Sequence, residues 1–69
     1  MSLEHQFRQR IECAGATFVK LENGMVYFQD TPDKPIISLY AFCCDRDNIL
    51  LAIKSQREKM LVDHWESLA

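Results

Sequence analysis

The sequence lacks the features that mark membrane-spanning and disulfide-bonded proteins. No apolar run reaches the ~18 residues that a membrane span needs, and the first ten residues, MSLEHQFRQR, have no apolar stretch like that of a secretory signal. Three cysteines, an odd number without regular spacing, do not make a disulfide framework. We therefore expect a soluble, cytoplasmic protein without a membrane partner.

The chain also lacks a block of charge of one sign. Eight basic and ten acidic residues give a formal net charge of −2, and both signs are spread along the sequence. Nucleic-acid binding rests largely on the neutralisation of phosphates, and anionic membranes attract clusters of Lys and Arg. The charge balance therefore disfavours nucleic acid as the partner and leaves only a local basic patch as a route to it.

The composition is that of a folded protein. The chain is 48% hydrophobic and contains one Trp, two Tyr and four Phe, and it shows neither an internal repeat nor a linker. We expect one domain, residues 1–69. A chain this short buries only ~60% of the surface that its unfolded form exposes. Domains of this size usually gain stability from disulfides, a metal or a partner subunit, and the cysteine count argues against the first.

The beginning of the chain predicts a helix over residues 3–14. Ser2 can cap it, because a serine side chain accepts a hydrogen bond from an early backbone N–H. Gly15 follows directly and favours a left-handed stop. The apolar residues recur at spacings of four, four and three: Leu3, Phe7, Ile11 and Ala14.

A β-hairpin is predicted next. Asn23 and Gly24 form the strongest short hairpin signal, because a type I′ turn needs positive φ at both central positions. The flanking residues are rich in β-branched and aromatic side chains. We expect strands at residues 16–22 and 25–30.

A loop and a third strand follow. Pro32 and Pro35 set the loop, and we interpret Asp30 and Asp33 as turn-forming residues beside it. The next segment, IISLYAFCC, has apolar residues on both alternating faces, which favours a strand at 36–43.

A helix that begins early, near Ser38, is the alternative for this segment. The final helix can begin with a cap at Asp45 or Asp47. The order α-β-β-β-α predicts a two-layer α+β fold, a three-stranded antiparallel meander with both helices on one face.

This order and length resemble the double-stranded-RNA-binding domain. That family reads RNA with its first helix, a loop between its first two strands and a lysine-rich start to its last helix. Here the corresponding loop is the two-residue turn at Asn23 and Gly24, and the last helix begins with the acidic DRDNILL. The resemblance is one of topology, so it transfers no RNA-binding residue.

The final helix is longer than the sheet it should cover. A helix of about 22 residues spans ~33 Å, whereas strands of six or seven residues span ~20–24 Å. The polar segment KSQREK, residues 54–59, separates an apolar cluster near Ile49 and Ile53 from a distal cluster. The distal cluster consists of Met60, Leu61, His64, Trp65 and Leu68.

We expect this distal cluster to lie past the sheet and to form a homodimer interface. The alternative is a break near Ser55 and Gln56 that folds the tail back over the first helix. The segment has no glycine or proline to make such a turn.

No residue pattern predicts catalysis or a cofactor. Cys43 and Cys44 stand at a strand-to-helix junction, where a thiol pKa can fall, but Asp45 and Asp47 place negative charge beside them. His64, a conceivable base, lies some four helical turns away. The cysteines are therefore interpreted as small apolar residues.

Metal and ligand sites are equally unsupported by the pattern. The two-to-four-residue spacing of zinc ligands is absent, and both glycines are used in turns, so no phosphate loop is present. The aromatic residues of the strands are interpreted as core, with a small-molecule pocket between sheet and helices as the alternative: Phe18, Tyr27, Tyr40 and Phe42.

These observations predict a non-enzymatic binding or regulatory module, a homodimer that binds another protein. Its size is typical of small bacterial or phage accessory proteins. One alternative is a nucleic-acid-binding dimer that uses a basic helix face made of Lys54, Arg57 and Lys59. Another is a small-molecule-binding dimer with an interfacial pocket near Trp65. No metal or cofactor is expected.

Overall fold

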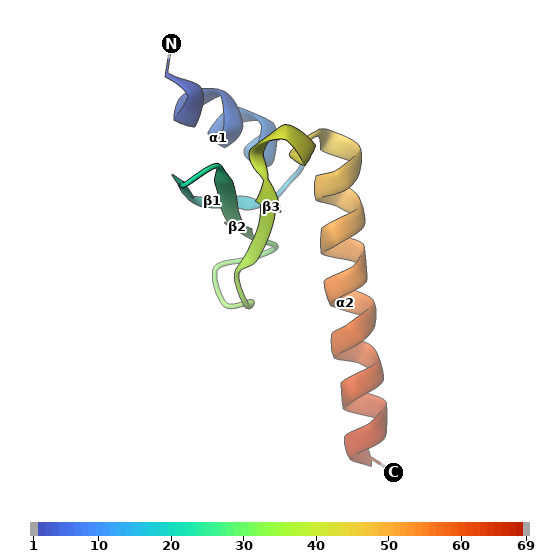
Figure 1. Cartoon of the computed structure of the whole chain (residues 1–69). Coiled ribbons are helices and arrows are strands. Elements are labelled where there is room, and N and C mark those ends of the chain that lie inside the picture. Colours follow the sequence, from blue (N-terminus) through green and yellow to red (C-terminus); the bar gives the residue numbers. More distant parts are fainter. Residues whose placement is uncertain (1, 69) are drawn as a thin grey trace.

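The computed structural model describes residues 2–68, with side chains for residues 2–65 (Figure 1). It confirms the predicted α+β order. The elements are α1 (Leu3–Cys13), β1 (Thr17–Glu22), β2 (Met25–Gln29), β3 (Ile37–Tyr40), a short 3₁₀ helix (Ala41–Cys43) and α2 (Arg46–Leu68). The three strands form an open antiparallel sheet in the order β1-β2-β3.

The two ends of α1 are closed as the sequence predicts. The hydroxyl oxygen of Ser2 accepts a hydrogen bond from the backbone N–H of His5 at 3.2 Å. At the other end Gly15 has φ 85°, and its N–H donates to the carbonyl of Glu12 while Ala16 donates to that of Ile11. These two bonds make a Schellman motif, which satisfies carbonyls that the helix leaves open.

The hairpin turn also confirms its prediction. Asn23 has φ 51° and Gly24 has φ 75°, the positive values that a type I′ turn requires. The two strands that it joins are paired from Glu22 and Met25 outward. The turn therefore fixes the register of β1 on β2.

A β-bulge in β1 changes which side chains face the core. Phe18 pairs with Phe28, but Lys20 pairs with Tyr27, so Val19 is an extra residue on β1. Strand side chains alternate between faces, and one extra residue reverses the alternation. Phe18 and Leu21, three residues apart, thus both pack against the core.

The predicted third strand at 36–43 is too long. β3 ends at Tyr40, which lies opposite Met25, the first residue of β2. Beyond Met25 the neighbouring chain has already turned, so a longer β3 would have no strand to pair with. The N–H of Ala41 donates to the carbonyl of Gly24, and residues 41–43 then form a 3₁₀ helix. The alternative of a helix from Ser38 is also wrong, because Ser38 lies within β3.

Both helices pack on one face of the sheet around a single core. Its buried residues are Phe7, Ile11, Ala16, Val26, Phe28, Cys44, Ile49 and Ile53. They come from α1, from β2, from α2 and from the segments between them. The other face of the sheet carries no helix (Figure 1).

The start of α2 is tied to the rest of the domain by polar contacts. Of the two predicted caps, Asp45 is the one that caps α2. Its carboxylate accepts a hydrogen bond from the backbone N–H of Asn48 at 2.8 Å. The side-chain amide of Asn48 donates to the carbonyl of Cys43, and Arg10 of α1 donates to the carbonyl of Cys44 at 2.8 Å. Contacts with α1 and with the 3₁₀ helix therefore fix the direction in which α2 leaves the sheet.

Candidate interaction surface on the long helix

α2 is one continuous helix of 23 residues. At 1.5 Å per residue it is about 34 Å long, and the longest strand, six residues, covers about 20 Å. The alternative of a break near Ser55 and Gln56 is wrong, since both residues are helical. The helix projects from the domain (Figure 1), and the molecule is 50 Å long and 20 Å across.

The sheet and its loops hold only the first half of α2. Ile49 and Ile53 are buried in the core. One turn further, the side-chain amide of Gln56 donates to the carbonyl of Pro35 at 3.0 Å. The next residue, Arg57, forms an ion pair with Asp30. From residue 58 to residue 65 every side chain is exposed.

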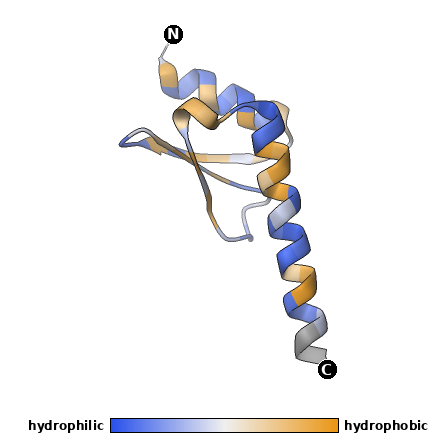
Figure 2. Cartoon of the chain, turned by 45° about the vertical axis from the view of Figure 1, so that its right-hand side comes forward, coloured by the Kyte–Doolittle hydropathy of each residue, from blue (hydrophilic) through white to orange (hydrophobic). Residues whose placement is uncertain are grey.

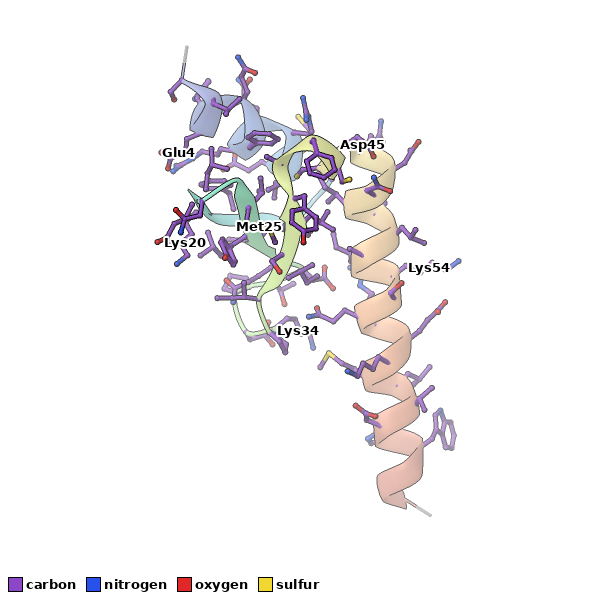
Figure 3. The ribbon with its side chains drawn as sticks, viewed as in Figure 1. Glu4, Lys20, Met25, Lys34, Asp45 and Lys54 are labelled. Atoms are coloured by element: carbon purple, nitrogen blue, oxygen red, sulfur yellow. The ribbon has the colours of Figure 1, made fainter. Side chains whose placement is uncertain are left out.

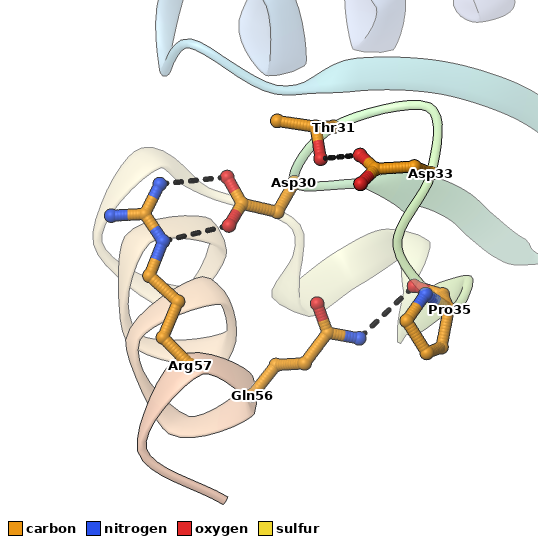
Figure 4. Close-up of polar contacts among 6 residues, drawn as sticks. All are labelled: Asp30, Thr31, Asp33, Pro35, Gln56 and Arg57. Carbon is orange, nitrogen blue, oxygen red and sulfur yellow. Dashed lines mark hydrogen bonds and ion pairs between the residues drawn. The ribbon is translucent and has the colours of Figure 1, made fainter. Parts of the chain in front are cut away.

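The ion pair between Asp30 and Arg57 fixes the helix to the end of β2 (Figure 4). The Nε and Nη2 of Arg57 donate to the two carboxylate oxygens of Asp30 at 2.7 and 2.8 Å. Asp30 is buried, and Arg57 remains largely exposed. The hydrogen bonds from Arg57 hold the pKa of Asp30 below its ordinary value and outweigh its burial, which acts in the opposite direction.

The turn-forming interpretation of Asp30 is therefore wrong. Asp33 does act in the loop, where its carboxylate accepts a hydrogen bond from the hydroxyl of Thr31. Asp30 instead binds a residue 27 positions later. No local sequence pattern predicts an ion pair between residues that far apart in the chain.

This ion pair predicts an acid-dependent stability. Because the pKa of Asp30 is lower in the folded chain, its contribution is present above its unfolded pKa of ~3.9 and is lost as the pH falls through the folded value. We expect the urea midpoint of Asp30→Asn to lie below that of the wild type at pH 7, and the difference to shrink below pH ~4.

The matched control is Asp63→Asn, at an exposed position of the same helix. Its midpoint should follow that of the wild type at both pH values. A difference between wild type and Asp30→Asn that stays constant down to pH 2 would contradict the role given to the ion pair.

The structure does not bring all three residues of the predicted basic face together, although Lys54 and Arg57 lie only about 60° apart around α2. Residues on a helix are ~100° apart, so Arg57 and Lys59 lie about 160° apart around α2. Lys54 points away from the sheet (Figure 3). The guanidinium of Arg57 is engaged by Asp30.

The distal cluster lies beyond the sheet, as its position in the sequence indicates. Figure 2 shows two hydrophobic parts of α2 separated by a hydrophilic one. Leu61 is 56% exposed and Trp65 is 64% exposed. The side chain of Leu68 lies outside the described residues.

The described residues of the distal cluster are spread over about 140° around the helix. Met60 lies about 20° from Ile53 around the helix axis, so it continues the side that faces the sheet, and His64 lies about 40° from Met60. Leu61 and Trp65 lie on another side, about 100° away. The four predicted interface residues whose side chains are described thus range from the side of α2 that faces the sheet to the side that faces away from it.

The side that carries Leu61 and Trp65 continues toward the start of α2. We call this the back stripe, and it consists of Leu51, Lys54, Glu58, Leu61 and Trp65. Their spacing of three and four residues is that of a coiled-coil contact line. The sequence interpretation missed Leu51 because it lies inside the run ILLAI, whose isoleucines were assigned to the core.

One of the three cysteines, Cys44, contributes to the core. Cys44 is buried in the core, and burial raises the pKa of its thiol. All three cysteines are free, with Cys13 exposed and Cys43 half-buried. Within residues 2–65 no three His, Cys, Asp or Glu side chains lie close enough to hold a metal ion.

Two aromatic residues are neither core nor pocket. Tyr40 and Phe42 stack on each other with ring centroids 5.4 Å apart, and Phe42 is 85% exposed. Both earlier interpretations are wrong for this pair. Phe18 does pack against the core. The Nζ of Lys20 lies over the ring of Tyr27, 5.0 Å from the ring centroid.

Comparison with family models, with curated protein sequences and with solved structures gives no match. In the part of the chain that the structure describes, no helix combines the length and the apolar character needed to cross a membrane.

Proposed function

We propose that the chain is a small, non-enzymatic binding module that forms a homodimer through α2 and acts by binding another protein. One observation carries the proposal: α2 extends past its own sheet and exposes Leu61 and Trp65 there. Contiguous exposed apolar surface of this kind is typical of protein interfaces.

The energetics of a small domain support self-association. Burial of a large apolar side chain contributes ~1.5–3 kcal/mol. At ~0.05–0.15 kcal/mol per residue, a 69-residue domain is stable by only about 3–10 kcal/mol. Covering Leu61 and Trp65 with a second copy would therefore contribute a large fraction of the stability of each copy.

The exposed aromatic pair supports a further protein partner. Tyr40 is the last residue of β3 and Phe42 lies in the 3₁₀ helix that follows, and both side chains are exposed on the surface. Aromatic residues are enriched at the centres of protein interfaces. The nucleic-acid alternative has less support, because Arg57 already binds Asp30 and Lys59 lies on another side of α2.

Self-association is tested by sedimentation equilibrium of the purified chain. We expect the wild type to form dimers at high micromolar concentration, and the double variant Leu61→Ala and Trp65→Ala to shift the distribution to monomer. Alanine preserves helix propensity, so the change removes apolar area without breaking α2.

The matched control is Leu3→Ala, since Leu3 on α1 is 57% exposed, as Leu61 is. The control should sediment like the wild type. A wild-type chain that stays monomeric at high micromolar concentration would refute the proposal.

A further inference from the structure

The back stripe of α2 has two charged residues in its middle, flanked by apolar residues on both sides, and this order suits a specific partner. Leu51, Leu61 and Trp65 are each more than half exposed. Lys54 and Glu58 lie between them, one helical turn apart and of opposite sign. Neither takes part in an ion pair within residues 2–65.

We propose that the occupant of this stripe is the back stripe of a second copy, packed antiparallel about a two-fold axis level with Gln56. This inference rests on the proposed function, since it supplies the geometry of the homodimer. In an isologous interface each contact occurs twice. The axis places Lys54 opposite the second copy's Glu58, and Leu51 opposite the second copy's Leu61.

Charge complementarity selects this arrangement over a parallel one. In a parallel pair Lys54 would face Lys54 and Glu58 would face Glu58, and like charges across a helix pair disfavour it. In the antiparallel pair both charges meet opposite charges, and leucine meets leucine on each side. In this register the charges and the two leucines of the stripe are matched, and Trp65 faces Asp47 near the start of the second copy's helix.

The position of the domain leaves room for the second helix. The back stripe is centred about 140° around α2 from Ile49 and Ile53, which face the core. Lys54, in the middle of the stripe, points away from the sheet (Figure 3). In the dimer the two helices therefore form the inner layer, and each sheet with its α1 lies outside.

Charge reversal tests the register. Lys54→Glu and Glu58→Lys each turn two attractive contacts into two repulsive ones, so we expect each to raise the dimer dissociation constant about tenfold at low salt. The double variant restores opposite charges in both contacts and should return to within about threefold of the wild type. The single-variant effect should shrink at 1 M salt, where the Debye length is ~3 Å.

Sedimentation equilibrium measures the constants, and circular dichroism confirms that each variant keeps the helix. If the dissociation constant of the dimer is the same in the wild type and both single variants, the antiparallel register is wrong, whereas the proposed dimer itself is not contradicted. A double variant no tighter than the singles would also overturn the register. A monomeric wild type would overturn the proposed function as well.

Discussion

Phe28→Ala leaves the chain mostly unfolded at 25 °C. Phe28 is completely buried at the centre of β2, opposite Phe18 on one side and Ile37 on the other. Truncation of a buried phenylalanine costs about 3–5 kcal/mol, part of it from the cavity that is left. A domain of this size has about 3–10 kcal/mol in total, so the loss is comparable with its whole stability.

Urea denaturation followed by circular dichroism measures this loss. The matched control is Phe42→Ala, the same chemical change at a side chain that is 85% exposed. The control should change the free energy of unfolding by no more than about 0.5 kcal/mol. Equal effects of the two substitutions would contradict the placement of the core on this face of β2.

Ile49→Ala has the second largest expected effect, a loss of about 2–5 kcal/mol. Ile49 is completely buried and, with Ile53, supplies the fully apolar part of the contact between α2 and the core. Ala52 packs against the same core, and further along α2 Gln56 and Arg57 add polar contacts. Removal of Ile49 therefore weakens the docking of the whole helix as well as the core.

The control for this experiment is Leu50→Ala, the adjacent residue, which is exposed. Both variants are compared at one low protein concentration, because dimer formation would add a concentration-dependent stability. A similar loss for both would mean that α2 docks by a different side from the one described.

The parts of the fold that the sequence predicted are those set by local chemistry. Ser2 and Gly15 close α1, and Asn23 with Gly24 closes the hairpin, because a cap or a positive φ depends on a few neighbouring residues. The end of β3 depends instead on where β2 begins. The bulge at Val19 likewise depends on the pairing of two strands, which a single strand pattern does not reveal.

The candidate surface was predicted in position but not in shape. The length of the helix was enough to place Leu61 and Trp65 beyond the sheet. Which residues of the distal cluster lie nearest to the sheet side became visible only when Ile49 and Ile53 had fixed which side faces the core. The ion pair of Asp30 with Arg57 joins two segments whose separation in sequence gives no periodic signal.

The position of the ion pair between Asp30 and Arg57 also determines how a small tilt of α2 would move the end of the helix. It lies near the middle of the helix, and eleven more residues extend beyond it to Leu68. That arm is about 16 Å long, so a tilt of about 10° at this point moves its tip by about 3 Å. The carboxylate of Asp30, just after β2, thus helps to set the direction of this arm, together with the contacts of Gln56 and of the buried isoleucines.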